Sequence, residues 1–159
     1  MEPSDPATTG LIIVDHGSRR PESNDLLIKV AAAYRQHTGR PIVEPAHMEL
    51  AEPSIAAAFA RCVEQGARLV VVFPYFLGPG RHWSEDIPRL VAEAAEPYAD
   101  RGVQFFVTAP IGLHPLMFDI VTDRIGHCLN RARGAAEACD VCADGGGCTH
   151  LPPLAQPAT

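Results

Sequence analysis

The chain has 159 residues, of which 47% are hydrophobic and 20% are charged, the balance of one globular domain with a single core. Its formal net charge of −6 argues against a nucleic-acid-binding surface, which needs a clustered basic excess. No apolar run reaches the ~18 residues of a membrane-spanning helix. We therefore expect neither a nucleic-acid nor a membrane partner.

The first residues contain no recognisable targeting signal. Met1-Glu-Pro-Ser-Asp5 is polar and acidic, unlike a secretory signal or an Arg-rich transit peptide. We expect a cytoplasmic protein. The alternative is the plastid stroma, if the source is a photosynthetic eukaryote and a presequence is absent.

Taken in chain order, the elements begin after a short lead-in. Residues 1–9 show no apolar periodicity and are expected to be disordered. Leu11–Val14 is a continuous apolar run, typical of a strand buried on both faces. Apolar residues then recur at helical spacing, which predicts an amphipathic helix over 22–38 that ends at Gly39.

This strand–helix unit is followed by three more. Further strands are expected at 41–46, 68–73 and 103–109, and each is followed by a helical apolar stripe. Pro53 suits the first turn of the second helix. Strands alternating with helices predict parallel β-α-β units with right-handed crossovers. We predict an α/β domain over 10–133 with a four-stranded, parallel, doubly wound, flavodoxin-like sheet.

The C-terminal segment has a different character. Periodicity is lost from Gly134, so residues 134–159 are expected to form an irregular tail. The tail contains Cys139, Cys142 and Cys148 at C-x2-C-x5-C spacing. Five cysteines with this spacing suit a reducing compartment and metal ligation better than a disulfide framework. Only a cysteine-bound metal is expected to order this segment.

Polar side chains follow all four predicted strands. They are His16, Arg19 and Arg20 after the first, His47 and Glu49 after the second, Arg81 and His82 after the third, and His114 after the fourth. Ligands of open parallel sheets bind outside this carboxyl edge, so these residues mark the expected site. His47 has an alternative, because neighbouring positions of a strand face opposite sides. His114 precedes Pro115 and could simply shape that turn.

The chemistry of this edge suits metal handling. Imidazole and carboxylate groups together bind Fe(II), Co(II), Ni(II) or Zn(II). Imidazole also exchanges protons near neutral pH. Arginines bind carboxylates through bidentate, charge-assisted hydrogen bonds, although solvated loop charges are the alternative for all three arginines.

Three segments resemble a known family, the short-form sirohydrochlorin chelatases, which are class II chelatases that need no ATP. The segments are Ile13–Asn24 with its His-Gly-Ser-Arg motif, Glu44–Ile55, and Pro74–Pro88 with Gly-Arg-His-Trp. The resemblance runs from about residue 11 to 132. The cysteine tail extends it to the iron–sulfur-bearing sirohydrochlorin ferrochelatases of plants and related bacterial forms.

This resemblance implies a function. Fe(II) would be inserted into sirohydrochlorin, an octacarboxylate, to form sirohaem; Co(II) insertion for cobalamin synthesis is the alternative. His16 and His82 would handle the metal, with Glu49 as the acidic catalytic residue. Ser18, Arg19, Arg20 and Arg81 are expected to bind the substrate. The domain would be half of a class II chelatase unit, and a homodimer would enlarge the shallow cleft of a thin sheet.

The resemblance also implies an iron–sulfur cluster, of the [2Fe-2S] type, on Cys139, Cys142 and Cys148. Three thiolates are one fewer than iron–sulfur or structural zinc sites normally use. Cys128, His150 or a cysteine of a partner subunit could complete the set. A zinc site and no metal at all are the alternatives.

Two rival functions make different predictions. Histidine phosphatases also have a His-Gly pair after their first strand, but with Arg before the His, where this chain has Asp15. A non-enzymatic metal or tetrapyrrole carrier could use the same side chains. Such a carrier would stop near stoichiometry, whereas a chelatase turns over many equivalents.

Overall fold

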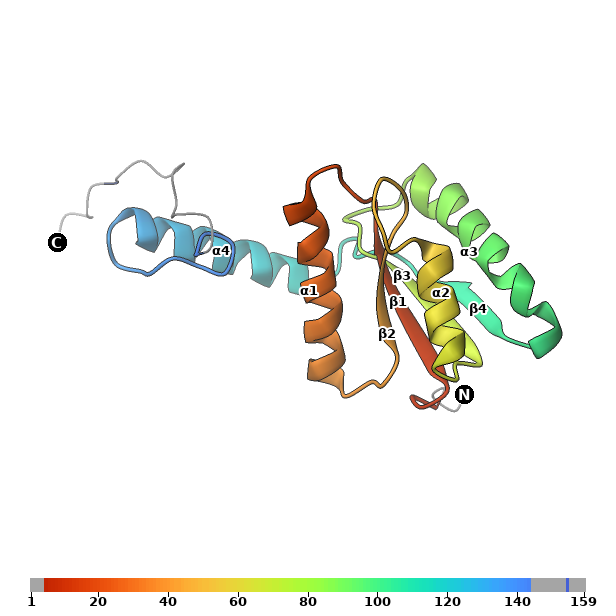
Figure 1. The fold of residues 1–159 in the computed structure, drawn as a ribbon. Coiled ribbons are helices and arrows are strands. Elements are labelled where there is room, and N and C mark those ends of the chain that lie inside the picture. Colours follow the sequence, from red (N-terminus) through yellow and green to blue (C-terminus); the bar gives the residue numbers. More distant parts are fainter. Residues whose placement is uncertain (1–4, 144–153, 155–159) are drawn as a thin grey trace. The chain divides into compact units, whose positions relative to one another are not determined.

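The computed structural model describes residues 5–143 and Leu154 (Figure 1). The chain divides into two compact units, Met1–Gly112 and Leu113–Thr159, which are considered separately below.

The first unit is built on four parallel strands, β1 (Thr9–Asp15), β2 (Val43–His47), β3 (Leu69–Pro74) and β4 (Gln104–Val107). Their order is β2-β1-β3-β4, which confirms the predicted four-stranded doubly wound α/β fold. β1 pairs with β2 so that Asp15 lies opposite His47. The carboxyl end of β1 therefore lies beside those of β2 and β3, and the residues that follow share one edge of the sheet.

The helices follow the predicted stripes with local changes. The α-helices are α1 (Pro21–Thr38), α2 (Ile55–Glu64), α3 (Ile87–Ala95) and α4 (Leu116–Ala132). A π-helical turn, η1 (His82–Asp86), precedes α3, and a 3-10 helix, η2 (Glu96–Arg101), follows it. Tyr98, which continues the apolar spacing of α3, lies in η2. The cause is Pro97, which has no N–H to continue the α-helical ladder. No helix in residues 5–143 is long and apolar enough to cross a membrane.

The sheet also begins earlier than expected. β1 starts at Thr9, which is buried and whose hydroxyl donates to the Asp5 carbonyl at 2.9 Å. Nearby, the backbone N–H of Arg68 donates to the Thr8 carbonyl at 2.8 Å. Thr8 and Thr9, at the end of the lead-in that was predicted to be disordered, are thus held at the sheet by hydrogen bonds. Backbone hydrogen bonds do not depend on side-chain type, so no sequence pattern predicts them. Residues 1–4 lie outside the described part of the chain.

The start of α2 differs from the prediction. Pro53 does not occupy the first helical turn, because it follows a cis peptide bond and precedes the N-cap residue Ser54. The Ser54 hydroxyl accepts a hydrogen bond from the Ala57 N–H at 3.2 Å. A side-chain cap of this kind satisfies one of the free N–H groups of the first turn.

Ser54→Ala is expected to lower the free energy of unfolding by about 1 kcal/mol, because it leaves that N–H without its cap. Urea unfolding followed by circular dichroism measures the effect. Ser84→Ala, at an exposed position in η1, is the matched control and should change stability by less than about 0.5 kcal/mol. Equal stability of Ser54→Ala and the parent protein would contradict the capping role.

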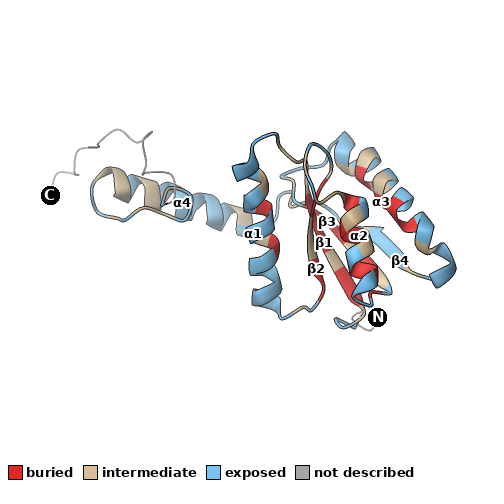
Figure 2. Ribbon diagram, in the orientation of Figure 1, coloured by how far each residue is buried: buried red, intermediate tan, exposed pale blue. Residues whose placement is uncertain are grey.

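The core lies on both faces of the sheet because neighbouring strand residues point to opposite sides (Figure 2). Ile12 and Val14 pack with α2 and α3 in the larger cluster, which includes the fully buried Phe59. Ile13 packs with Leu27 of α1 in the smaller cluster. Two-sided burial explains why the strands read as continuous apolar runs.

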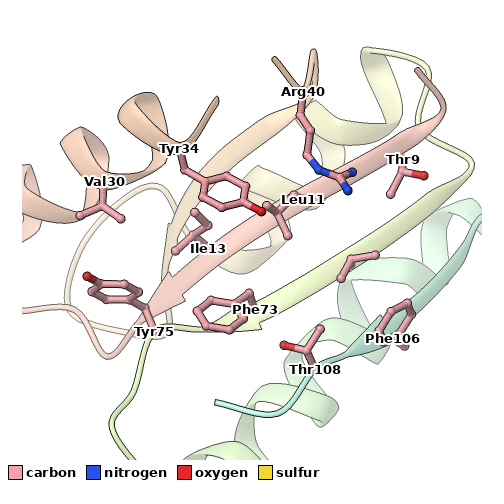
Figure 3. Close-up of a pocket in the computed structure, with 11 residues that line it drawn as sticks. Thr9, Leu11, Ile13, Val30, Tyr34, Arg40, Phe73, Tyr75, Phe106 and Thr108 are labelled. Atoms are coloured by element: carbon pink, nitrogen blue, oxygen red, sulfur yellow. The ribbon is translucent and has the colours of Figure 1, made fainter. Parts of the chain in front are cut away.

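On the α1 side, the smaller cluster borders an apolar groove of about 430 Å³ (Figure 3). Leu11, Ile13, Phe73 and Phe106 form its floor on the strands, and Tyr34 of α1 forms part of its wall. Phe106 is half exposed. None of the predicted site residues lines this groove, so it is an apolar surface separate from the polar strand edge.

Candidate metal-handling site

The structure brings His16 and His82 together. Their ring centroids lie 5.1 Å apart with an edge-to-face angle of 68°. His16 follows β1, and His82 follows the loop after β3, the neighbouring strand in the sheet. Both side chains are partly exposed, at 40% and 49%. Two accessible imidazoles at one strand edge can receive a metal ion from solvent.

His16 is held by the turn that follows β1. Its Nδ1 donates to the Gly17 carbonyl at 3.0 Å, and its Nε2 lies 2.9 Å from Oε1 of Glu49. Both ring nitrogens therefore face oxygen atoms, and Nε2 and the carboxylate are close enough to share a proton. Imidazole and carboxylate together form a site that stores and transfers a proton.

Glu49 reaches this position by an extension of the β1–β2 pairing. The N–H of Met48 donates to the Asp15 carbonyl at 2.8 Å, and the N–H of Glu49 donates to the His16 carbonyl at 3.0 Å. Gly17, with a φ of +85°, passes so close that a Cβ there would lie 1.9 Å from the Glu49 carbonyl oxygen. Only glycine fits this crossing.

His82 is oriented by a carboxylate that sequence reasoning missed. Its Nδ1 donates to Oδ2 of Asp86 at 2.8 Å, which leaves Nε2 with a free lone pair. In metal sites, a carboxylate that accepts a hydrogen bond from one ring nitrogen of a histidine fixes its tautomer and leaves the other nitrogen for the metal. The i,i+4 spacing of His82 and Asp86 was the signal in the sequence that could have identified this pair.

The segment around His82 is anchored on two further sides. Phe76 stacks on the His82 ring with 6.5 Å between the centroids. The indole N–H of Trp83 donates to the Thr108 carbonyl, beyond β4, at 2.8 Å. The backbone closes a π-helical turn, in which the Ile87 N–H donates to the His82 carbonyl. Such π turns are frequent at functional sites.

The other two candidate histidines differ from this pair in their local surroundings. His47 is fully buried, and its Nδ1 lies 2.6 Å from Oδ1 of Asp15. It therefore turns away from the solvent-accessible edge, as the alternation of strand residues allowed. His114 belongs to the second unit, where its Nδ1 accepts a hydrogen bond from the Leu116 N–H at 3.3 Å. This contact agrees with the turn-shaping alternative.

The predicted substrate-binding residues lie in the loops around the site. Arg19 and Arg20 are exposed, and Arg81 is exposed and 3.3 Å from the carboxylate of Glu85. The Ser18 hydroxyl accepts a hydrogen bond from the Arg20 N–H at 3.0 Å. All three arginines are thus exposed, and the Ser18 hydroxyl shapes the turn before α1.

The tail is ordered by more than its cysteines. In the second unit, Arg124 forms a bidentate ion pair with Asp140, and Nε2 of His127 donates to the Glu137 carbonyl at 3.0 Å. The hydrogen bond from Arg124 holds the pKa of the Asp140 carboxyl below its usual value. For residues 134–143, the expectation that only cysteine ligation orders the tail is therefore wrong. Side chains of α4 fold residues 134–143 back onto the helix.

The cysteines divide into two chemical types. Backbone N–H groups of Val141 and Cys142 lower the pKa of the Cys139 thiol, which favours its thiolate. Burial raises the pKa of Cys62 to about 12, and the nearby Glu44 adds to the effect. Cys139 is thus suited to bind a metal and Cys62 is not. Cys148 and His150 lie outside the described residues.

Across residues 5–143, no three His, Cys, Asp or Glu side chains form a ready-made metal-holding group. The strand edge offers two imidazoles, of which His16 contacts oxygen atoms through both ring nitrogens and His82 contacts one through Nδ1. Such a sparse ligand set suits transient binding, because tight structural sites normally supply four ligands. A low affinity for the metal ion is needed in any protein that transfers the ion to another molecule.

Two facing imidazoles at the strand edge of a parallel sheet define an α/β domain with a candidate metal site at that edge. The comparisons with known proteins identify which one. Residues 10–128 match the model of the CbiX family, and the chain belongs to this family.

Two relatives are named as chelatases. The chain is 58% identical over 134 residues to "Sirohydrochlorin ferrochelatase, chloroplastic" of Arabidopsis thaliana, covering 84% of this chain and 59% of that protein. It is 46% identical over 81 residues to "Sirohydrochlorin cobaltochelatase" of Methanocaldococcus jannaschii, covering 51% and 57% respectively. The chain therefore spans less than two thirds of the length of these relatives.

Solved structures agree with the fold. A putative cobalamin biosynthesis CbiX protein from Marinobacter aquaeolei VT8 has a TM-score of 0.64 and 29% identity, covering 77% of this chain and 98% of that one. The sirohydrochlorin chelatase SirB from Bacillus subtilis subspecies spizizenii, in complex with cobalt, has a TM-score of 0.69 and 29% identity. It is matched over 75% of this chain and 50% of that one.

Proposed function

We propose that this protein inserts Fe(II) into sirohydrochlorin, without ATP, to form sirohaem. The observation that carries the proposal is the opposed pair of imidazoles, His16 and His82, at 5.1 Å. A carboxylate lies beside one nitrogen of each ring, Glu49 at His16 and Asp86 at His82. The name and 58% identity of the plant relative support this substrate and metal.

In this proposal His82 receives the metal. Its Nδ1 proton is held by Asp86, so the Nε2 lone pair points away from that contact and binds the incoming ion. Imidazole is a moderate ligand for Fe(II) and Co(II), and it releases the ion when the four macrocycle nitrogens compete for it. His16 supplies the second imidazole from the facing side.

His16 and Glu49 handle the protons. Two pyrrole N–H protons must leave the macrocycle as the metal enters. The His16–Glu49 pair accepts these protons, and the 2.9 Å separation of Nε2 and Oε1 lets the imidazole pass each one to the carboxylate. Glu49 is 54% exposed, so its carboxylate returns each proton to water without a buried relay.

The loop arginines bind the substrate carboxylates in this proposal. Arg19, Arg20 and Arg81 are exposed around the site, and guanidinium groups bind carboxylates in a bidentate manner. Ser18 holds the turn that presents the first two arginines. Their positive charge also offsets the overall charge of −6 where the anionic macrocycle approaches.

An anaerobic assay tests the proposed function. Sirohydrochlorin is mixed with Fe(II), Co(II) or Ni(II) in parallel, and metallation is followed by visible absorbance above the spontaneous rate. Many turnovers with Fe(II) as the best metal are expected. A preference for Co(II) would favour the cobaltochelatase activity named for the archaeal relative. Product that stops at one equivalent would indicate a carrier.

We further propose that Cys139, Cys142 and Cys148 hold an iron–sulfur cluster of the [2Fe-2S] type. The turn in which the Cys142 N–H donates to the Cys139 carbonyl at 3.0 Å brings the first two close, and the lowered pKa of Cys139 favours the thiolate that iron needs. The fourth ligand is Cys128, His150 or a partner's cysteine. The proposed insertion reaction has no net electron transfer, so the cluster is assigned a regulatory, sensing or dimer-linking role.

Cys139→Ser is expected to abolish cluster binding, because serine does not replace a thiolate ligand that backbone N–H groups stabilise. Iron and acid-labile sulfide, with visible absorbance, are measured on anaerobically purified protein. Cys62→Ala is the control and should keep the cluster, since Cys62 is buried in the core. Stoichiometric zinc without sulfide in the parent protein would contradict the cluster.

We also propose that the protein is a homodimer. The apolar groove beside α1, with the half-exposed Phe106, is a surface that a second copy can cover. A second copy would also give the open strand edge a facing wall for a large macrocycle. Light scattering of the purified protein tests this, with an expected mass of twice the 17.1 kDa of one chain.

The compartment is proposed to be either the cytoplasm or the plastid stroma. The plant relative is named as chloroplastic, which supports the stromal alternative for a protein from a photosynthetic eukaryote. Immunolocalisation in the source cell distinguishes the two.

A further inference from the structure

We propose that His47 and Asp15 form a buried positioning pair that orients the His16 imidazole toward Glu49. This inference rests on the proposed function, because it takes His16 as a metal- and proton-handling residue. His47 touches neither metal nor substrate in this proposal. It acts on the site through a continuous series of hydrogen bonds.

The series begins at the ends of β1 and β2. Asp15 and His47 are register partners, and Nδ1 of His47 donates to Oδ1 of Asp15 at 2.6 Å. The His47 side chain is fully buried, whereas a quarter of the Asp15 side chain is exposed. A short, charge-assisted hydrogen bond shielded from water is strong and directional.

The same carboxylate oxygen holds the turn that carries His16. Oδ1 of Asp15 also accepts a hydrogen bond from the Gly17 N–H at 2.9 Å. The carbonyl of Gly17 in turn accepts from Nδ1 of His16 at 3.0 Å. The Gly17 residue therefore joins the carboxylate to the imidazole, and the direction of the His16 ring depends on where Asp15 holds this turn.

His47 also anchors the segment that carries Glu49. Its backbone N–H donates to the Pro53 carbonyl at 2.8 Å, and its Cβ lies 3.1 Å from the position that a Gly17 Cβ would take. Glu49 is two residues further along. His47 thus lies beside the Gly17 turn that carries His16 and at the start of the segment that carries Glu49.

A merely space-filling role does not explain a histidine at this position. Nε2 of His47 is buried without a hydrogen-bond partner, and burying such an atom is costly. Leucine would fill the same space without that cost. Leucine lacks the Nδ1 donor, which in the structure donates a hydrogen bond to Oδ1 of Asp15.

The experiment compares three variants of the full-length protein by metallation rate, Co(II) absorbance and thermal unfolding. His47→Leu fills the space but has no donor. His47→Asn has a side-chain N–H close to where Nδ1 lies. Val72→Ala, in the core of β3, is the matched control that loses stability without touching the hydrogen-bond series.

His47→Leu is expected to lower Co(II) affinity and the metallation rate at least ~10-fold. Loss of a hydrogen bond that orients a metal-binding side chain usually has an effect of this size. His47→Asn should restore most of that loss, and Val72→Ala should leave Co(II) affinity unchanged at 20 °C. Equal Co(II) affinity and rate in His47→Leu and Val72→Ala would overturn the proposal. So would a His47→Asn variant as impaired as His47→Leu.

One measurement needs no variant and covers the case in which His47→Leu does not fold. Nitrogen-15 NMR of the imidazoles in the unmodified protein should show His47 protonated at Nδ1 and bare at Nε2. Protonation at Nε2 alone would overturn the proposal. His16→Ala distinguishes failure of the positioning role from failure of the proposed function. Undiminished metallation by His16→Ala would contradict the proposed function. Impaired metallation by His16→Ala, together with unchanged metallation by the His47 variants, would contradict the positioning role alone.

Discussion

His82→Ala and His16→Ala are each expected to slow enzymatic metal insertion by about 100-fold or more, the lower end of what a positioned acid–base or metal-binding group contributes. The reasons differ. His82→Ala removes the Nε2 lone pair that Asp86 leaves free, so it should mainly weaken metal binding. His16→Ala removes the imidazole that lies beside the Glu49 carboxylate, so it should mainly lower kcat.

Steady-state metallation at varied Fe(II) or Co(II) concentration measures both effects, after the spontaneous rate is subtracted. His37→Ala, on an exposed position of α1, is the matched control and should keep parental kinetics. Thermal unfolding checks that the fold is intact. Undiminished metallation by both site variants would remove the proposed role of the pair.

Gly17→Ala is expected to reduce the free energy of unfolding by about 3 kcal/mol and to abolish most metallation. The new Cβ would lie 1.9 Å from the Glu49 carbonyl oxygen, and the φ of +85° is itself unfavourable for alanine. Relief of the clash must separate the two segments that bring His16 to Glu49. For a chain of this length, such a loss corresponds to a fall in Tm of about 10 °C.

Gly39→Ala separates the clash from the backbone preference. Gly39 has a φ of +68°, but nothing lies near the position of its Cβ. This variant should lose about 1 kcal/mol and keep full activity. Calorimetry and the metallation assay on both proteins measure the difference. Equal losses of stability in the two variants would contradict the steric account.

The fold was predictable because its signals are local. Buried parallel strands such as Leu69–Pro74 need continuous apolar runs, and helices that cover them need apolar stripes at helical spacing. The edge that carries His16 and His82 then follows from topology. These features depend on residues close in sequence, so they can be read without the structure.

What could not be predicted depends on the register between strands and on backbone detail. The Asp15–His47 bond exists because β1 and β2 pair in one register, which no local pattern specifies. Leu50, with a φ of +66°, and the cis bond before Pro53 bend the chain after β2 in a way that sequence patterns did not indicate. Asp86 is an intermediate case. Its i,i+4 spacing to His82 is present in the sequence and is compatible with a side-chain pair, but only in a helical turn.

The π-helical turn at His82–Asp86 makes chain length a part of the site. In this turn the Ile87 N–H reaches back five residues to the His82 carbonyl, while the Ile87 side chain is fixed in the core. Removing one residue between them would restore an ordinary α-helical turn and rotate His82 by about 100° around the helix axis. The imidazole would then leave His16, although every named side chain was still present. The position of His82 therefore depends on the number of residues in this segment as well as on their identity.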